Sequence, residues 1–152
     1  MHDLSKKGGI FTKGEVSLTQ LEEALKRGGH ITKAGAIFTF TGIVRESSLH
    51  SEKKVVAIEI EAWPDKASEE METIAQEVQE QYGLVDIRVW HATGRFRVGE
   101  EMIFVVVAAR HRSEGLEAIE QTIRHYKKRS PIWKKEIYED GSEDWISGKD
   151  KR

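Results

Sequence analysis

The residues best suited to chemistry in this chain lie in one short basic segment. Between Arg124 and Lys135 the sequence carries six lysines and arginines, one histidine and no acidic residue. The full chain of 152 residues has a formal net charge of -2, so this segment runs against the overall balance. Fixed cations hold anions, and a lysine partly withdrawn from water also serves as a nucleophile or proton shuttle. We therefore expect an anionic ligand here.

Two lysines of this segment are the strongest candidates. Lys127 lies at the boundary of the buried stripe of a predicted helix, so we expect it to be partly withdrawn from water. A basic helix end that complements the helix dipole is enough to explain Lys128 and Arg129. It does not explain Lys134, which lies beyond Pro131 and hence outside the helix.

Two further basic sites lie at strand ends. His111 and Arg112 follow an apolar strand and precede a helix, where free backbone N–H groups and a basic pair suit an anion. A histidine that merely ends a strand is an equally open interpretation. Arg45 ends another strand, and a solvated arginine is the simplest interpretation of it. No two of the six histidines have the spacing of metal ligands, so we expect no metal site.

Hydrophobic periodicity predicts strands and helices in a mixed order. The predicted strands cover residues 35–45, 54–62, 85–93, 102–109, 132–138 and 144–146. The predicted helices cover residues 17–27, 64–83 and 113–130. We expect Gly94–Gly99 to form a turn or irregular segment and Asp140–Gly141 to be a hairpin turn. This order predicts an α+β fold with a mixed or largely antiparallel sheet and packed helices.

The same patterns predict which side chains face the core. In the second strand we expect Val56, Ile58 and Ile60 to point inward. In the last helix we expect Ser113 to be the N-cap. The expected inner face of that helix consists of Leu116, Ile119, Ile123 and Tyr126.

Composition and length exclude several classes of protein. The length predicts one domain over residues 1–152, with residues 1–9 and 147–152 expected to be disordered. No apolar run approaches the roughly 20 residues of a membrane span, so we expect no membrane partner. No secretory signal is apparent, and we expect a cytoplasmic protein. The chain has no cysteine, which excludes disulfides, thiolate metal sites and a persulfide carrier.

Three motifs, in the same order and at compatible spacing, resemble the family of the large, catalytic subunit of molybdopterin synthase. The resemblance runs from about Ile10 to Trp145 and includes the closing segment Gly141-Ser142-Glu143-Asp144-Trp145. The three motifs are Gly35-Ala36-Ile37-Phe38-Thr39-Phe40-Thr41-Gly42-Ile43-Val44-Arg45, Ala109-Arg110-His111-Arg112-Ser113 and Lys127-Lys128-Arg129-Ser130-Pro131-Ile132-Trp133-Lys134-Lys135-Glu136.

The resemblance implies a fold, an assembly and a reaction. It implies an α/β-hammerhead fold and a homodimer that forms the core of a heterotetramer. Each protomer would bind a small ubiquitin-like sulfur carrier whose C-terminal Gly-Gly tail ends in a thiocarboxylate. Sulfur would pass from that tail to cyclic pyranopterin monophosphate to form the dithiolene of molybdopterin. The pterin is then a substrate, so no cofactor is expected.

The resemblance also implies roles for single residues. Lys127 and Lys134 match the positions of two catalytic lysines. A basic residue beyond the last tryptophan, here Lys149, would reach the pocket of the neighbouring protomer, where a lysine is a point charge and not a bidentate fork. The implied substrate-binding residues are Arg45, His111, Arg112 and Lys149.

Two other functions remain open. A docking subunit would bind a ubiquitin-like Gly-Gly tail without performing chemistry. A nucleic-acid-binding module would use the basic segment with Tyr126 and Trp133 as stacking surfaces, but six acidic residues between Asp65 and Glu80 disfavour it, so we expect no nucleic-acid partner. The enzymatic interpretation requires that Arg45, Lys127 and the other predicted site residues converge on one cleft.

Overall fold

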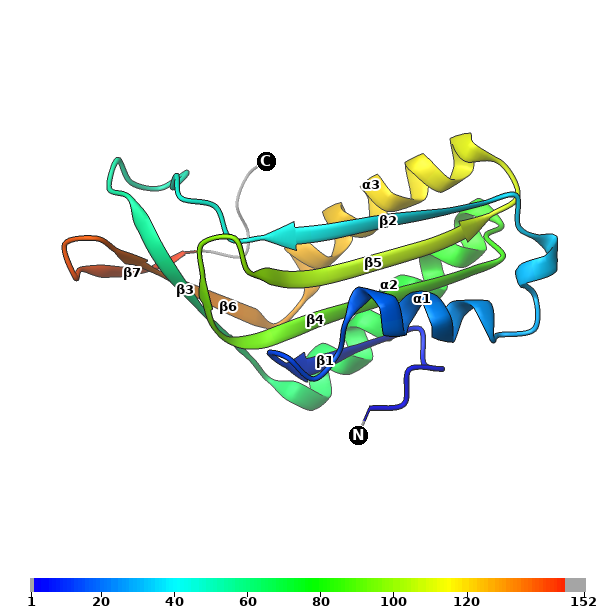
Figure 1. Ribbon diagram of the computed structural model, residues 1–152, viewed down its shortest axis with the longest axis horizontal. Coiled ribbons are helices and arrows are strands. Elements are labelled where there is room, and N and C mark those ends of the chain that lie inside the picture. The colour runs from blue at the N-terminus through cyan, green and yellow to red at the C-terminus, as the bar shows by residue number, and fades with distance from the viewer. Residues whose placement is uncertain (1, 147–152) are drawn as a thin grey trace.

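The computed structural model describes residues 2–146, which form three α-helices, a short 3-10 helix and seven strands (Figure 1). The strands are β1 (Gly8–Thr12), β2 (Ala36–Ile43), β3 (Val55–Ala62), β4 (Asp86–Arg97), β5 (Glu101–Ala109), β6 (Ile132–Tyr138) and β7 (Glu143–Ile146). The helices are α1 (Leu18–Lys26), η1 (Ile31–Lys33), α2 (Pro64–Tyr82) and α3 (Arg112–Arg129). Lys149 and the segment 147–152 lie outside the described residues.

One mixed sheet organises the fold. Its strand order is β2-β5-β4-β3-β6-β7 with antiparallel neighbours, and β1 pairs with β4 in parallel. Strand β4 joins the two halves of the sheet, because residues 86–91 pair with β5 and residues 94–97 pair with β3. The predicted α+β fold with a mixed sheet is thus confirmed. The segment expected to be irregular is instead mostly strand, since Gly94–Arg97 continue β4.

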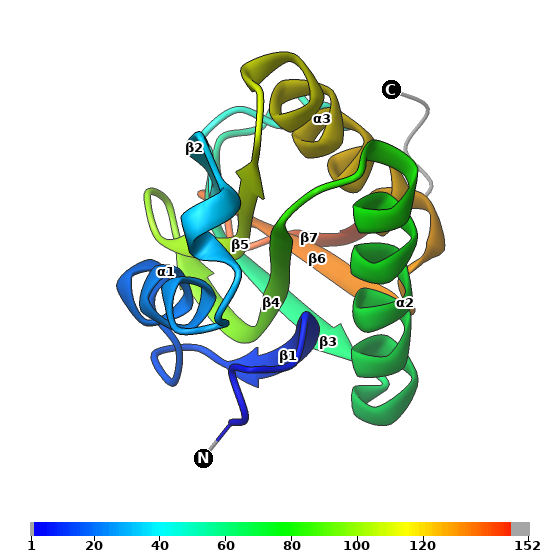
Figure 2. The same ribbon diagram turned by 90° about the vertical axis from the view of Figure 1, so that its right-hand side faces the viewer.

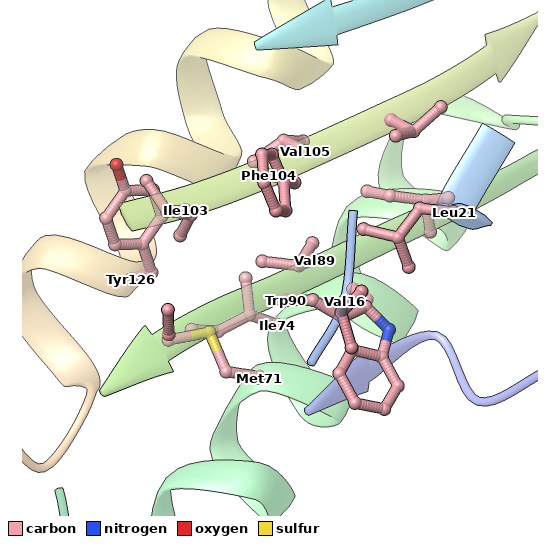
Figure 3. Packing of buried hydrophobic residues seen from close by; sticks show 14 of the residues in the cluster. Val16, Leu21, Met71, Ile74, Val89, Trp90, Ile103, Phe104, Val105 and Tyr126 are labelled. Carbon is pink, nitrogen blue, oxygen red and sulfur yellow. The ribbon is translucent and has the colours of Figure 1, made fainter. Parts of the chain in front are cut away.

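Helices cover both faces of the sheet. Helix α1 lies across the sheet from α2 and α3, which lie side by side (Figure 2). The core between them includes Leu21 of α1, Met71 and Ile74 of α2, and Val89 of β4 (Figure 3). Residues 103–109 of β5 are all buried, which confirms that this strand is the most enclosed one.

Local signals placed several element ends correctly. Ser17 caps α1, and its side chain and that of Gln20 form the predicted reciprocal capping box. The predicted end of α2 at Gly83 and the hairpin of β6 and β7 are also observed. Pro64, which ends the preceding strand, occupies the first turn of α2, where its missing N–H group costs no helical hydrogen bond.

The predicted inner face of β3 was wrong at one residue. Val56 is 42% exposed, whereas Ala57, Ile58 and Ile60 are buried. The register with β6 shifts between Val55 and Ala57, and such an irregularity turns the adjacent side chain away from its alternating side.

The predicted inner face of α3 was also partly wrong. The helix begins at Arg112, with His111 and not Ser113 at the N-cap position, and Leu116 is 59% exposed. Its buried residues are Gly115, Ala118, Thr122 and Tyr126. Small residues let α3 approach the sheet closely, since a Cβ on Gly115 would lie 2.4 Å from the ring of Phe38.

Residues 2–9, expected to be disordered, have defined positions and include the start of a strand that we did not predict. A Cβ on Gly8 would lie 2.5 Å from the backbone of Met71, so only glycine lets β1 pass between β4 and α2. Arg88 and Trp90 of β4 donate side-chain hydrogen bonds to the carbonyls of Leu4 and Lys6 at 2.9 and 3.2 Å. These long-range contacts hold a segment that has no hydrophobic periodicity of its own.

Candidate active site

A cavity of about 440 Å³ lies where the end of β2, the end of α3 and strand β6 meet. Arg45 reaches it from the loop after β2, and Lys127 from the last turn of α3. Lys134 and Glu136 line it from β6, and His91 lines it from β4. The cavity therefore collects side chains from segments that are distant in the sequence.

Three of the predicted site residues come together in this cavity. Arg45 and Lys127 are exposed, and Lys134 is half-buried between its strand neighbours Ile60 and Ile146. Among the described residues, none of the three cations forms an ion pair with a carboxylate. No carboxylate of residues 2–146 neutralises their positive charge by ion pairing, so the cavity suits an anionic ligand.

Lys134 is the cavity lysine that is withdrawn from water. Burial, together with the charge of Lys127, lowers the pKa of Lys134 to about 8. We expected Lys127 to be the residue withdrawn from water, and this was wrong, because Lys127 is exposed at the end of α3. Lys134 is withdrawn because side chains of β6 alternate, and its position shares the inner face with Glu136.

His91 belongs to the cavity although nothing in the sequence singled it out. Its side chain is buried, and its ring lies edge-on to Tyr126 at a centroid distance of 6.0 Å. Burial and the charge of Lys134 lower the pKa of His91 to about 3, so the imidazole is neutral. The available signal was weak: one histidine inside the apolar strand predicted over residues 85–93.

Glu136 is a second residue that the sequence analysis missed. Its carboxylate Oε1 accepts hydrogen bonds from the hydroxyls of Ser48 at 2.6 Å and Tyr138 at 2.8 Å. Burial, with this bond to Glu136, raises the pKa of Tyr138 to about 12. The Ser48 contact ties the loop that follows Arg45 to the strand carrying Lys134, and so fixes one edge of the cavity.

His111 and Arg112 do not reach the cavity. Both are exposed at the N-terminal end of α3, while Lys127 lies at the other end. At 1.5 Å per residue the helix separates Arg112 from Lys127 by roughly 22 Å. The fourth predicted substrate-binding residue, Lys149, lies outside the described residues.

Other members of the basic segment have structural partners. Arg129 forms ion pairs with Glu70 at 2.7 Å and Glu77 at 2.6 Å, which join α3 to α2. Lys135 pairs with Glu59 at 3.0 Å. The dipole interpretation of Arg129 was therefore incomplete. Arg129 and Lys135 are thus occupied by carboxylates, whereas no ion pair within residues 2–146 involves Lys127 or Lys134.

Within residues 2–146, no three histidine, aspartate or glutamate side chains gather in a group that could hold a metal ion. In the same range, no helix is long and apolar enough to cross a membrane.

The fold and cavity define an α+β protein with an open cavity lined by cations. The family model described as MoaE protein matches residues 11–129. The chain belongs to this family, which confirms the resemblance indicated by the three motifs.

Individual relatives agree with this assignment. The molybdopterin synthase catalytic subunit of Pyrococcus abyssi is 40% identical over 117 residues, which make up 77% of this chain and 77% of that protein. The crystal structure of molybdopterin synthase from Staphylococcus aureus matches with a TM-score of 0.80 and 28% identity, covering 93% of this chain and 97% of that one. A complex of subunits 1 and 2 of molybdopterin-converting factor from Helicobacter pylori contains the same fold, with a TM-score of 0.68, 20% identity and coverage of 95% and 91%.

Proposed function

We propose that this chain is the catalytic subunit of a molybdopterin synthase, a sulfurtransferase of molybdenum cofactor biosynthesis. The observation that carries the proposal is the cavity in which Arg45, Lys127 and Lys134 lie together without an anionic partner among the described residues. Relatives with that name support it, and the one from Pyrococcus abyssi matches over 77% of this chain. The composition without cysteine fits a reducing compartment, and we propose a cytoplasmic location.

The substrates of this reaction suit the cavity. The cyclic phosphate of the pterin and the thiocarboxylate of a carrier tail are both anions, and lysine and arginine stabilise both. A volume of about 440 Å³ lies in the range of small-molecule sites. Because the chain has no cysteine, it cannot hold sulfur as a persulfide, so a partner has to supply it. We propose a small ubiquitin-like carrier ending in Gly-Gly as that partner.

The two lysines have different roles in the proposed mechanism. The carrier sulfur displaces oxygen from a side-chain carbon of the pterin: a C–S bond forms, which gives an acyl–sulfur adduct, and the C–O bond at that carbon breaks, with the oxygen leaving as water or as a freed phosphate oxygen. Water then adds to the acyl carbon, the acyl C–S bond breaks, and the carrier leaves as a carboxylate while the sulfur stays on the pterin. Lys134, with its pKa near 8, accepts and returns a proton in these steps. The ammonium group of Lys127 stabilises the negative charge that develops on the adduct.

The distant pair at the start of α3 suggests a dimer. His111 and Arg112 cannot reach the cavity of their own chain. We propose that a second copy inserts the start of its α3 at the mouth of the cavity, and that this homodimer with two carriers is a heterotetramer. Lys149 of the second copy would add a further positive charge for the phosphate.

Reconstitution with defined substrates tests the function. The chain is mixed with a thiocarboxylated carrier and cyclic pyranopterin monophosphate, and formation of the dithiolene is measured. The matched control is the same carrier with an ordinary C-terminal carboxylate. We expect product only with the thiocarboxylate. Tight carrier binding without any dithiolene would contradict the enzymatic assignment and favour the docking subunit instead.

A further inference from the structure

His91 presents one fixed polar atom to the cavity. Its Nδ1 lies 2.8 Å from the backbone carbonyl oxygen of Ala92. A carbonyl oxygen only accepts hydrogen bonds, so Nδ1 must carry the proton of the neutral ring. The other ring nitrogen, Nε2, is then unprotonated and is a hydrogen-bond acceptor.

No group within residues 2–146 donates a hydrogen bond to this acceptor. Among the described residues, no hydrogen bond reaches His91 Nε2, including from its neighbours Tyr126 and Lys134. Within the same range, the enclosed side-chain polar atoms that lack a partner are Gln79 Oε1 and Ser130 Oγ. His91 lines the cavity, so its Nε2 is open to whatever occupies that space.

The acceptor is chemically unlike the cations around it. Arg45, Lys127 and Lys134 are hydrogen-bond donors suited to the phosphate and thiocarboxylate. Glu136 is an acceptor, but Ser48 and Tyr138 already occupy its Oε1. A ligand that forms a hydrogen bond with His91 Nε2 has to donate it from an N–H or O–H group. The reduced pterin ring of the proposed substrate carries such N–H groups.

We propose that His91 Nε2 accepts a hydrogen bond from a ring N–H group of the pterin, and thereby fixes the orientation of the ring in the cavity. This inference rests on the proposed function for the identity of the ligand. The cations bind the anionic parts of the substrates, and His91 recognises the neutral ring. His91 is therefore a specificity-determining residue that contacts the pterin and transfers no proton.

The charge state of His91 supports this role. Its ring is buried and has the positive charge of Lys134 nearby, which together keep its pKa far below neutrality. The other titratable groups on the cavity wall are Glu136 of β6, Tyr126 and Lys127 of α3, and Arg45 and His50 from the loop after β2. A neutral imidazole cannot attract the phosphate as a cation would, so its contribution has to be independent of pH through the neutral range.

Two substitutions separate the two ring nitrogens. In His91→Asn, the side-chain amide occupies the place of Nδ1 and still donates to Ala92, but no atom replaces Nε2. In His91→Gln, the amide oxygen lies near the place of Nε2 and preserves the acceptor. Thermal unfolding of both variants shows whether the cavity stays intact, and His91→Leu, which fills a similar volume without an acceptor, replaces the Asn variant in every comparison if the Asn variant does not fold.

Binding of cyclic pyranopterin monophosphate is measured by calorimetry, with inorganic phosphate as a second probe. We expect His91→Asn to raise the Kd of the pterin at least about 10-fold, the loss of one buried hydrogen bond, and His91→Gln to recover most of it. The Kd of inorganic phosphate should stay within about twofold, because that anion contacts only the cations. The ratio of the pterin Kd values of the Asn variant and wild type should be constant from pH 5.5 to 7.5.

Three results would overturn the inference: an unchanged pterin Kd in the Asn variant, an equal loss for both probes, or a ratio that changes through pH 6.5. Failure of the His91 subsite can be distinguished from failure of the proposed sulfurtransferase function. If wild type forms dithiolene while His91→Asn binds pterin normally, only the subsite is wrong. If wild type binds pterin through His91 but forms no dithiolene, the subsite stands and the sulfurtransferase assignment fails.

Discussion

At the scale of single residues, adjacent lysines at the end of α3 should behave very differently. Lys127 lines the cavity, and Lys128 does not. We expect Lys127→Ala to lower turnover with saturating carrier by roughly 100-fold, since it removes a charge that stabilises the reacting adduct. Lys128→Ala is the matched control and should retain near wild-type turnover. Single-turnover assays of dithiolene formation measure both, and equal rates for the two variants would contradict the role of Lys127.

The buried, charged amine of Lys134 should reduce the free energy of unfolding at neutral pH. Its pKa falls from 10.5 to about 8 in the folded chain, so folding is less favourable when the lysine is charged than when it is neutral. This penalty is fully present below pH 8 and disappears above about pH 10.5, where the lysine is neutral in both states. Lys134→Met should therefore abolish activity and yet raise the Tm at pH 7 by several degrees, since about 1 kcal/mol corresponds to roughly 2–4 °C.

Thermal unfolding at two pH values checks the sign of this effect. The gain in Tm of Lys134→Met over wild type should be larger at pH 7 than at pH 9.5, because part of the wild-type penalty is already gone at the higher pH. An equal gain at the two pH values would show that hydrophobic packing of methionine, and not relief of a buried charge, is responsible, and a gain that grows with pH would contradict the direction of the pKa shift of Lys134.

At the scale of elements, the ion pairs of Arg129 should hold α3 against α2. Arg129 is half-buried and contacts both Glu70 and Glu77 across the helix pair, as the adjacent helices in Figure 2 make possible. Arg129→Ala leaves these two carboxylates without their partner, and we expect a loss of about 1–2 kcal/mol in the free energy of unfolding. Arg124→Ala is the control, because within residues 2–146 the ion pair of Arg124 is with Glu120 of its own helix, at an exposed position.

Urea unfolding measures both variants. Arg124→Ala should change the free energy of unfolding by no more than about 0.5 kcal/mol. Arg129→Ala should also loosen the end of α3 and so reduce turnover more than carrier binding. Equal stability of the two variants would mean that the pairs between the helices contribute no more than a solvated surface pair.

Local chemistry explains which elements the sequence predicted. The capping box of Ser17 and Gln20 is a contact between residues three apart, so the start of α1 is visible in the sequence. Strand β1 is not visible, because Gly8 and Gly9 have no side-chain alternation and are fixed by α2 and β4. The exposed Val56 follows from a register shift against β6, which is a property of the pair of strands and not of either one.

The same limit applies to the site. Motifs located Arg45, Lys127 and Lys134, and the structure brings these three together. Which of the two lysines is withdrawn from water depends on how α3 and β6 are placed relative to each other. The sequence favoured Lys127, whereas in the structure it is Lys134. His91 lies in an apolar strand, and its importance appears only when the end of α3 and β6 are folded against it.

At the scale of the whole molecule, the proposed homodimer predicts that two inactive variants restore each other. Arg112→Ala should disable the pocket of the second copy, whereas Lys127→Ala disables the pocket of its own chain. When the two variants are mixed and allowed to exchange subunits, half of the dimers are mixed. Each mixed dimer then has one pocket with both substitutions and one pocket with neither. Dithiolene formation should recover to about one quarter of the wild-type level.

The control uses two residues that line one cavity from the same chain. A mixture of Lys127→Ala and Lys134→Ala cannot produce an intact pocket, because every pocket inherits one of the two defects from its own chain. This mixture should stay inactive. If the mixture of Lys127→Ala and Arg112→Ala also stays inactive after verified subunit exchange, Arg112 does not act across a dimer. Since roughly 22 Å of helix separates it from its own cavity, a substrate-binding role for Arg112 would then be excluded.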